Sequence, residues 1–142
     1  MRARSWHREY IRSIVDRDVC DVARIKDADD VARLLKQLAI RTGELQNISG
    51  LANELKLSNS TVEKYLTVLE RLFLIRRLPS WQKHYANRLI KAPKIHLVDS
   101  GLSATLAGLD ADSWRDDRSR MGHLLESFVV QQVISQVGWT NE

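Results

Sequence analysis

The sequence lacks the features that mark secreted, membrane-spanning and metal-binding proteins. It has one cysteine, Cys20, so no disulfide can form within the chain, which is typical of the reducing cytoplasm. No apolar run approaches the length of a membrane span, and no signal-peptide core follows the basic N-terminus, so we expect neither export nor a membrane partner. No two of the four histidines have the spacing of a helical metal pair, so we expect no metal site.

Net charge is also small, at +4, and is too mild on its own to indicate a polyanionic partner. The distribution is more informative, because the span from Arg71 to Val98 has no acidic residue while the rest of the chain has an acidic excess. The span contains seven cationic side chains: Arg71, Arg76, Arg77, Lys83, Arg88, Lys91 and Lys94.

Trp81, His84 and Tyr85 are interleaved with these cations. This composition is typical of a wing that follows nucleic-acid phosphates, since Lys and Arg release condensed counterions and aromatic rings can pack on sugars or bases. The alternative is a solvated loop that balances the acidic remainder, or an interface to another domain.

Apolar residues three and four positions apart predict two helices before residue 43. The first spans about residues 2–22 and carries Trp6, Tyr10, Ile11, Ile14, Val15 and Val22. The second follows the carboxylates between Asp27 and Asp30, which can cap it, and ends at Thr42 and Gly43. Its predicted inner face consists of Val31, Leu34, Leu35, Leu38 and Ala39.

A short helix, a tight turn and a longer helix are predicted next. The short helix starts near Ser49 and carries Leu51, Ala52 and Leu55, with the turn at Lys56 and Leu57. Ser58 or Ser60 can cap the longer helix, the latter in a capping box with Glu63. Its predicted inner face is Val62, Tyr65, Leu66, Leu69, Leu72 and Phe73, and its outer face is Asn59, Glu63, Lys64, Thr67, Glu70 and Arg71.

Two short extended segments, residues 74–80 and 94–98, flank a basic connection. The predicted fold is therefore mainly α with a small β hairpin, a winged helix-turn-helix with flanking helices. A small helix is expected after Asp99 and a last helix from about Met121. The apolar face of the last helix is Leu124, Leu125, Phe128, Val129, Val133 and Val137, and we expect it to cause self-association.

Blocks such as STVEKYL and KAPKIHLVDSGL, with WHREYIRSIVDRDV before them and MGHLLESFVVQQV after, give the chain a family resemblance. It resembles the C-terminal half of a prokaryotic family of AAA-type ATPases whose tail is a domain of unknown function. The resemblance implies a preceding P-loop ATPase domain, then a winged helix, then a tail similar to restriction-endonuclease-like nucleases. It divides the chain into N-terminal helices (1–43), a winged helix-turn-helix (44–99) and the start of a truncated nuclease-like tail (100–142).

The sequence departs from that family in two ways. It has no GxxxxGK[ST] loop, so ATP and Mg²⁺ are implied only for the parent ATPase domain and we expect no cofactor in this chain. Only Glu126 matches the glutamate of the tail's first helix, and one carboxylate cannot hold the divalent ion that hydrolysis needs. We therefore predict a non-enzymatic fragment of a cytoplasmic ATPase.

Two other places could carry chemistry. Asp99 ends a predicted strand, but Asp followed by Ser and Gly is more often a turn or a helix cap. His123 and Glu126 have helical spacing and could form an acid–base couple, although a solvated polar face is the favoured interpretation.

The leading hypothesis is a winged-helix module that links the parent ATPase domain to its effector tail and contacts DNA without sequence specificity. Glu63 and Glu70 oppose direct base reading, because carboxylates meet phosphate repulsion. The predicted phosphate contacts are Arg76, Arg77, Lys83, Arg88 and Lys91, and the predicted groove-facing residues are Asn59, Lys64 and Thr67. The alternative is a protein-interaction or oligomerisation scaffold with no nucleic-acid binding; a nuclease is the weakest hypothesis.

Overall fold

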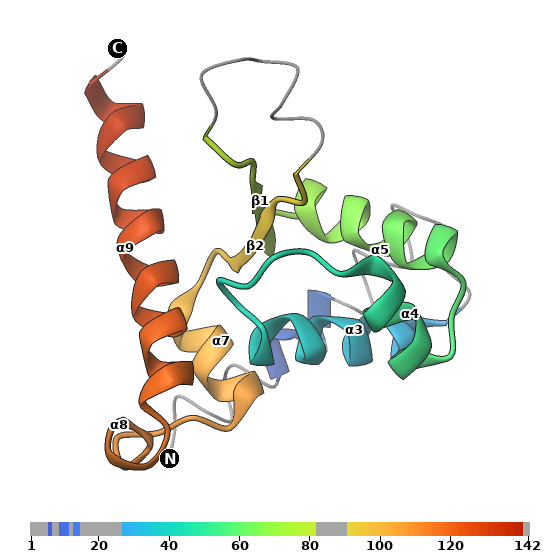
Figure 1. Cartoon of the computed structure of the whole chain (residues 1–142), viewed down its shortest axis with the longest axis horizontal. Helices are drawn as coiled ribbons and strands as arrows, with labels where there is room; N and C mark the ends of the chain where they lie inside the picture. Colours follow the sequence, from blue (N-terminus) through green and yellow to red (C-terminus); the bar gives the residue numbers. More distant parts are fainter. Residues whose placement is uncertain (1–5, 7–8, 12, 15–26, 82–90, 141–142) are drawn as a thin grey trace.

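The computed structural model describes residues 6, 9–11, 13–14, 27–81 and 91–140. These residues form six helices and a two-stranded antiparallel sheet, so the chain is mainly helical, as predicted (Figure 1). In chain order the elements are α3 (Ala28–Ile40), α4 (Ile48–Leu55), α5 (Asn59–Arg71), β1 (Ile75–Leu78), β2 (Lys94–Leu97), α7 (Ser100–Ala107), α8 (Ser113–Asp116) and α9 (Arg118–Thr140).

The described part of the opening segment is helical at residues 6, 9–11 and 13. Ile11 is buried in the core, whereas the rings of Trp6 and Tyr10 stack on the surface with centroids 5.1 Å apart. Val15 and Val22, also assigned to the inner face of this helix, lie outside the described residues.

Helix α3 begins where the sequence predicts and ends at Ile40, just before the predicted stop at Thr42 and Gly43. The Asp27 carboxylate caps it by accepting hydrogen bonds from the backbone N–H groups of Asp29 and Asp30. All five residues of its predicted inner face are buried. Gly43 turns the chain away with a φ of +81°, and a Cβ there would lie 3.2 Å from the carbonyl oxygen of His123.

The two helices that follow confirm the predicted order with small shifts. α4 begins at Ile48, capped by Asn47, whose side chain accepts from the Gly50 N–H. Lys56 adopts the left-handed conformation in the turn, with a φ of 57°. Ser58 caps α5 by accepting from the Thr61 N–H, so of the two candidate caps it is Ser58 that is used, and the capping box of Ser60 is not formed.

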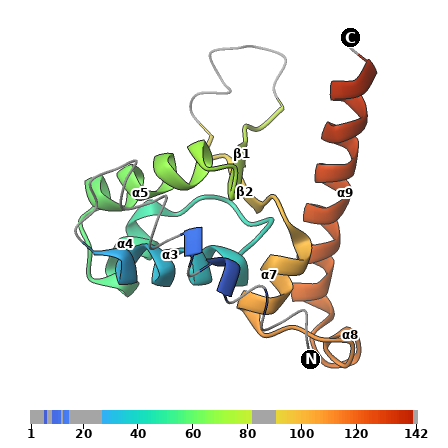
Figure 2. The same cartoon turned by 180° about the vertical axis from the view of Figure 1, so that it is seen from behind.

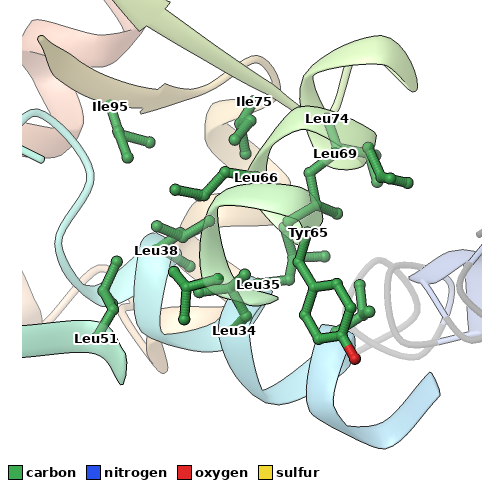
Figure 3. Packing of buried hydrophobic residues seen from close by; sticks show 14 of the residues in the cluster. Leu34, Leu35, Leu38, Leu51, Tyr65, Leu66, Leu69, Leu74, Ile75 and Ile95 are labelled. Carbon is green, nitrogen blue, oxygen red and sulfur yellow. The ribbon is translucent and has the colours of Figure 1, made fainter. Parts of the chain in front are cut away.

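Helix α5 packs on α3 through most of its predicted inner face. Figure 3 shows Leu66 and Leu69 of α5 above Leu34 and Leu35 of α3. The prediction for Phe73 is wrong: it is 79% exposed, because α5 ends at Arg71 and Phe73 has a φ of 56° in the turn to β1. Val68 is buried instead, and Leu72 is half-buried.

The strands pair antiparallel, with Ile75 opposite Leu97 and Leu78 opposite Lys94. The segment 43–46 runs along the other edge of β2. Gly43 N–H donates to the Ile95 carbonyl (2.7 Å), Ile95 N–H to the Glu44 carbonyl (3.0 Å), and Gln46 N–H to the Pro93 carbonyl (2.8 Å). β2 therefore lies between β1 and this segment, with Ile95 and Leu97 in the core.

After the sheet the chain continues into α7, α8 and α9, which lie to the left of α4 and α5 in Figure 1. α7 packs against α3, and its Leu102 and Ser103 are buried. α9 contacts α7 and α8 through its first half, while its second half extends past the body of the protein (Figures 1 and 2). No described helix is both long enough and apolar enough to cross a membrane.

Candidate functional site

The centre of the α5–β1 surface is an ion-pair cluster formed by Arg77, Glu63 and Glu70. Arg77 Nε and Nη2 donate to Glu70 Oε2 at 2.9 and 2.7 Å, and Nη1 donates to Glu63 Oε1 at 2.5 Å. Burial lowers the pKa of Arg77, but the hydrogen bonds to Glu70 and Glu63 outweigh it and raise the pKa above its ordinary value. The guanidinium therefore stays charged and joins the strand to two glutamates that lie about two turns apart on the helix.

This cluster changes the interpretation of the two glutamates. They lie on the outer face of α5, as predicted, but each is paired with a cation of the same chain. Their repulsion of phosphate is consequently reduced. Arg77, predicted to be a phosphate contact, has its guanidinium held by these carboxylates.

The three predicted groove-facing residues lie along α5. Asn59 is exposed at its N-terminus, with Nδ2 3.4 Å from Ser49 Oγ. Lys64 is exposed, and the half-buried Thr67 donates its hydroxyl to the Glu63 carbonyl at 3.0 Å. Arg71 is also exposed, seven residues after Lys64 and so on the same side of the helix.

The other predicted phosphate contacts are less uniform. Arg76 is half-buried, and its Nε is buried without a partner among the described residues. Lys91 is exposed, whereas Lys83 and Arg88 lie outside the described residues. Trp81 is 77% exposed and borders a pocket of about 420 Å³ together with Pro79 and Lys91.

Asp99 and the His123–Glu126 pair show no assembled acid–base geometry. Asp99 caps α7, accepting from the Leu102 N–H at 2.8 Å, as the cap interpretation requires. Lys94 Nζ donates to Glu126 Oε1 at 2.6 Å, and His123 Nδ1 lies 3.8 Å from Glu44 Oε1. Each member of the proposed couple thus has a different partner.

A pocket of about 410 Å³ lies where the C-terminus of α3, the segment 43–47, β2 and α9 meet. Two of its charged lining residues form ion pairs, Arg41 with Glu54 and Lys94 with Glu126, and Glu44 Oε1 lies 3.8 Å from His123 Nδ1. Among the residues that the structure describes, no group of three or more His, Cys, Asp or Glu side chains is arranged to hold a metal ion.

Sequence reasoning missed a buried polar cluster formed by Thr42, His96 and Ser127. The Ser127 hydroxyl donates to the His123 carbonyl (3.0 Å), so its oxygen is left to accept from His96 Nδ1–H (2.9 Å) and from the Thr42 hydroxyl (3.0 Å). Thr42 Oγ1 in turn accepts from the Leu97 N–H. The cluster joins the end of α3, β2 and α9, and no spacing signal exists for residues so far apart in the sequence.

His96 is fully buried in this cluster. Burial lowers its pKa below the ordinary value; Lys94 adds to this effect and Glu126 opposes it. Its Nε2 is buried with no partner in the described part of the chain. The imidazole is therefore neutral at pH 7, and its protonation in this buried site is unfavourable.

Comparison with known proteins identifies relatives of unassigned activity. The chain is 28% identical over 129 residues to uncharacterized proteins of Mycobacterium bovis and Mycobacterium tuberculosis, covering 91% of this chain and 29% of each relative. An uncharacterized protein of Haemophilus influenzae is 33% identical over 95 residues, covering 63% of this chain and 24% of that protein.

The chain thus spans less than a third of the length of these curated relatives. The relationship to AAA-type ATPases stays a prediction, because none of the relatives' names carries an activity. Residues 1–113 match the family described as "Domain of unknown function (DUF8612)", and the chain therefore belongs to that family.

Proposed function

We propose that this chain is a non-catalytic winged-helix module of a larger AAA-type ATPase, in which it links the ATPase domain to an effector tail. The supporting observation is the order α3, segment 43–46, α4, α5, β1, β2, with β2 paired on both edges. A helix, a first short strand, a helix-turn-helix and two strands joined by a wing make up the winged helix-turn-helix motif.

The linking role is supported by the single core beneath the module. Residues from α3, α5, β1, β2 and α7 belong to one buried cluster. A movement of the ATPase domain or of the effector tail would therefore be passed through one packed body. The small share of the relatives' length that the chain covers agrees with a part of a longer protein. The AAA-type parent, with its ATP and Mg²⁺, rests on the sequence resemblance alone.

Contact with DNA belongs to the same proposal. Lys64, Arg71 and Lys91 are exposed on α5 and beside β2, and Arg77 compensates the two glutamates that would repel phosphate. Contacts of this kind position a protein on the duplex without reading bases, so the binding is sequence-tolerant and sensitive to salt.

Fluorescence anisotropy with several unrelated labelled duplexes, at low and near-physiological salt, tests this contact. The variant Lys64→Ala/Arg71→Ala/Lys91→Ala should lose most of the affinity for every duplex, with a shallower salt dependence. The matched control is Lys36→Ala/Arg115→Ala/Arg118→Ala, which removes three exposed cations elsewhere. Equal losses in the two variants would mean that only net charge matters, and absence of binding at low salt would remove DNA from the proposal.

A protein-facing scaffold is the second candidate, favoured by a different observation. Of the five cations in the basic span that the structure describes, Arg77 and Lys94 form ion pairs within the chain. Before and after strand β1, Phe73 and Trp81 expose large apolar side chains. If the scaffold is correct, Trp81→Ala weakens binding to the purified N-terminal part of the longer protein, while the triple variant of the DNA test leaves that binding unchanged.

A further inference from the structure

A small surface pocket is lined by aromatic rings from two separate parts of the chain. It has a volume of about 270 Å³ and lies between the opening helical segment, the turn after α5 and the start of α7. Trp6 and Tyr10 line it with rings stacked at an interplanar angle of 8°, and Phe73 lines it from the turn. These three side chains are 41–79% exposed, so the aromatic lining is open to solvent.

Phe73 stands at a position where its side chain lowers the stability of the fold. α5 ends in a Schellman motif, in which Phe73 N–H donates to the Glu70 carbonyl and Leu74 N–H to the Leu69 carbonyl, both at 3.0 Å. The first of these residues takes a left-handed backbone, here with a φ of 56°, which strains a bulky side chain but not glycine. Because the ring is also largely exposed, the fold gains little burial in return. A bound group that packs on the ring would account for it.

Asp99 supplies the only charge among the described residues that line the pocket. Its Oδ1 accepts from the Leu102 N–H at 2.8 Å, and the carboxylate forms no ion pair with a cation in the described part of the chain. An apolar occupant would remove water from this carboxylate without replacing it, and an anion would be repelled. A cation pairs with the carboxylate and is also attracted to the faces of the rings. The lining therefore favours a cationic occupant.

The size of the pocket suits one side chain rather than a whole small molecule. Pockets that enclose a drug-sized ligand usually measure about 300–1,000 Å³, whereas this one is smaller and its aromatic lining is exposed. Of the two basic side chains that are always charged at neutral pH, arginine has a planar guanidinium that stacks on an aromatic ring while its edge donates to a carboxylate. A lysine ammonium is more strongly hydrated and has no plane to stack.

We propose that this pocket binds an arginine side chain of a protein partner. The guanidinium packs against the aromatic rings, and its N–H groups donate to the Asp99 carboxylate. The site is separate from the surface proposed for DNA, because Lys64, Arg71 and Lys91 do not line it. Its test is therefore independent of whether the chain binds DNA.

An NMR titration of the full ¹⁵N-labelled chain with the peptide acetyl-Gly-Arg-Gly-amide tests the site. The indole N–H signal of Trp6, identified by its loss in Trp6→Phe, should shift and saturate with a Kd on the order of 1 mM, since a single side chain is held. The peptide with citrulline in place of arginine keeps the shape without the charge and should bind at least about 10-fold more weakly. Equal binding of a leucine peptide, or no shift with the arginine peptide, would overturn the proposal.

Two variants test the roles of Asp99 and Phe73. Asp99→Asn keeps an oxygen for the helix cap but removes the charge, so the preference for arginine over citrulline should disappear. Asp112→Asn, at an exposed position outside the pocket, is the matched control and should keep that preference. Phe73→Gly should raise the midpoint of urea unfolding, because glycine suits the left-handed turn, and yet weaken binding of the arginine peptide. A preference that persists in Asp99→Asn, or unchanged binding in Phe73→Gly, would contradict the proposed site.

Discussion

Helices α5 and α9 both present a face to solvent, but the two faces are of opposite character. The outer face of α5 is charged, and its glutamates are tied to Arg77 from β1. The outer face of α9 is apolar, and its second half has no charged residue. A charged face is stable in water once its ions are paired, whereas an apolar one gains stability only by being covered. The charged face of α5 is thus stable in water through its own ion pairs, whereas α9 leaves apolar side chains uncovered.

The largest expected effect is a loss of stability on the inner face of α5, which we compare with a substitution on the outer face of α9. Leu66→Ala should lower the free energy of unfolding by about 2–5 kcal/mol, because it opens a cavity between α5 and α3. Val129→Ala removes a half-exposed side chain and should change it by less than about 0.5 kcal/mol. Urea unfolding at low protein concentration measures both. A comparable loss in the two variants would show that α9 is packed in the monomer.

The first half of α9 is held by polar contacts, and Ser127→Ala tests them. The change removes the partner of the Thr42 hydroxyl and of His96 Nδ1 in a dry site, so we expect a loss of about 1–3 kcal/mol. Ser135→Ala is a close control, because Ser135 also donates to the carbonyl four residues earlier but is exposed. If the free energy of unfolding falls equally in both variants, the buried cluster does not contribute to stability.

The same cluster predicts a pH dependence. Because burial lowers the pKa of His96 in the folded state, the unfolded chain takes up the proton first as pH falls. The stability is fully present above the ordinary histidine pKa of 6.5 and is lost progressively below it. Urea unfolding on both sides of that pH should show the loss, and His96→Gln should flatten it. The charged groups nearby, Lys94 and Glu126, remain in the variant and serve as its internal control.

Local sequence signals predicted the helices better than they predicted the surfaces. The inner face of α3 follows from spacing and a carboxylate cap, which act within a few residues. The prediction that Phe73 is buried is wrong because the apolar spacing continues past Arg71, where α5 ends. The left-handed conformation of Phe73 then turns its side chain away from the inner face. Periodicity cannot show where a helix stops when no Gly or Pro marks the end.

The candidate site was predictable only in part, because its key contacts join separate elements. His96 looks like one more polar residue in an extended segment, and its cluster brings together residues as distant as Thr42 and Ser127. For Arg77 a signal did exist. Glu63, Glu70 and Arg77 are seven residues apart, so the two carboxylates share a face of α5 toward which the next strand can direct a cation.

A weaker effect than the loss at Ser127 shows how Arg77 contributes to DNA binding. Its ion pairs are partly exposed, so Arg77→Ala should cost only about 0.5–1 kcal/mol of stability. If it acts by cancelling the carboxylates, the change weakens DNA binding in the wild-type background but not in Glu63→Gln/Glu70→Gln. A double-mutant cycle by anisotropy measures this coupling. Equal losses in both backgrounds would mean that Arg77 touches phosphate directly, so that its ion pairs with the glutamates must open when DNA binds.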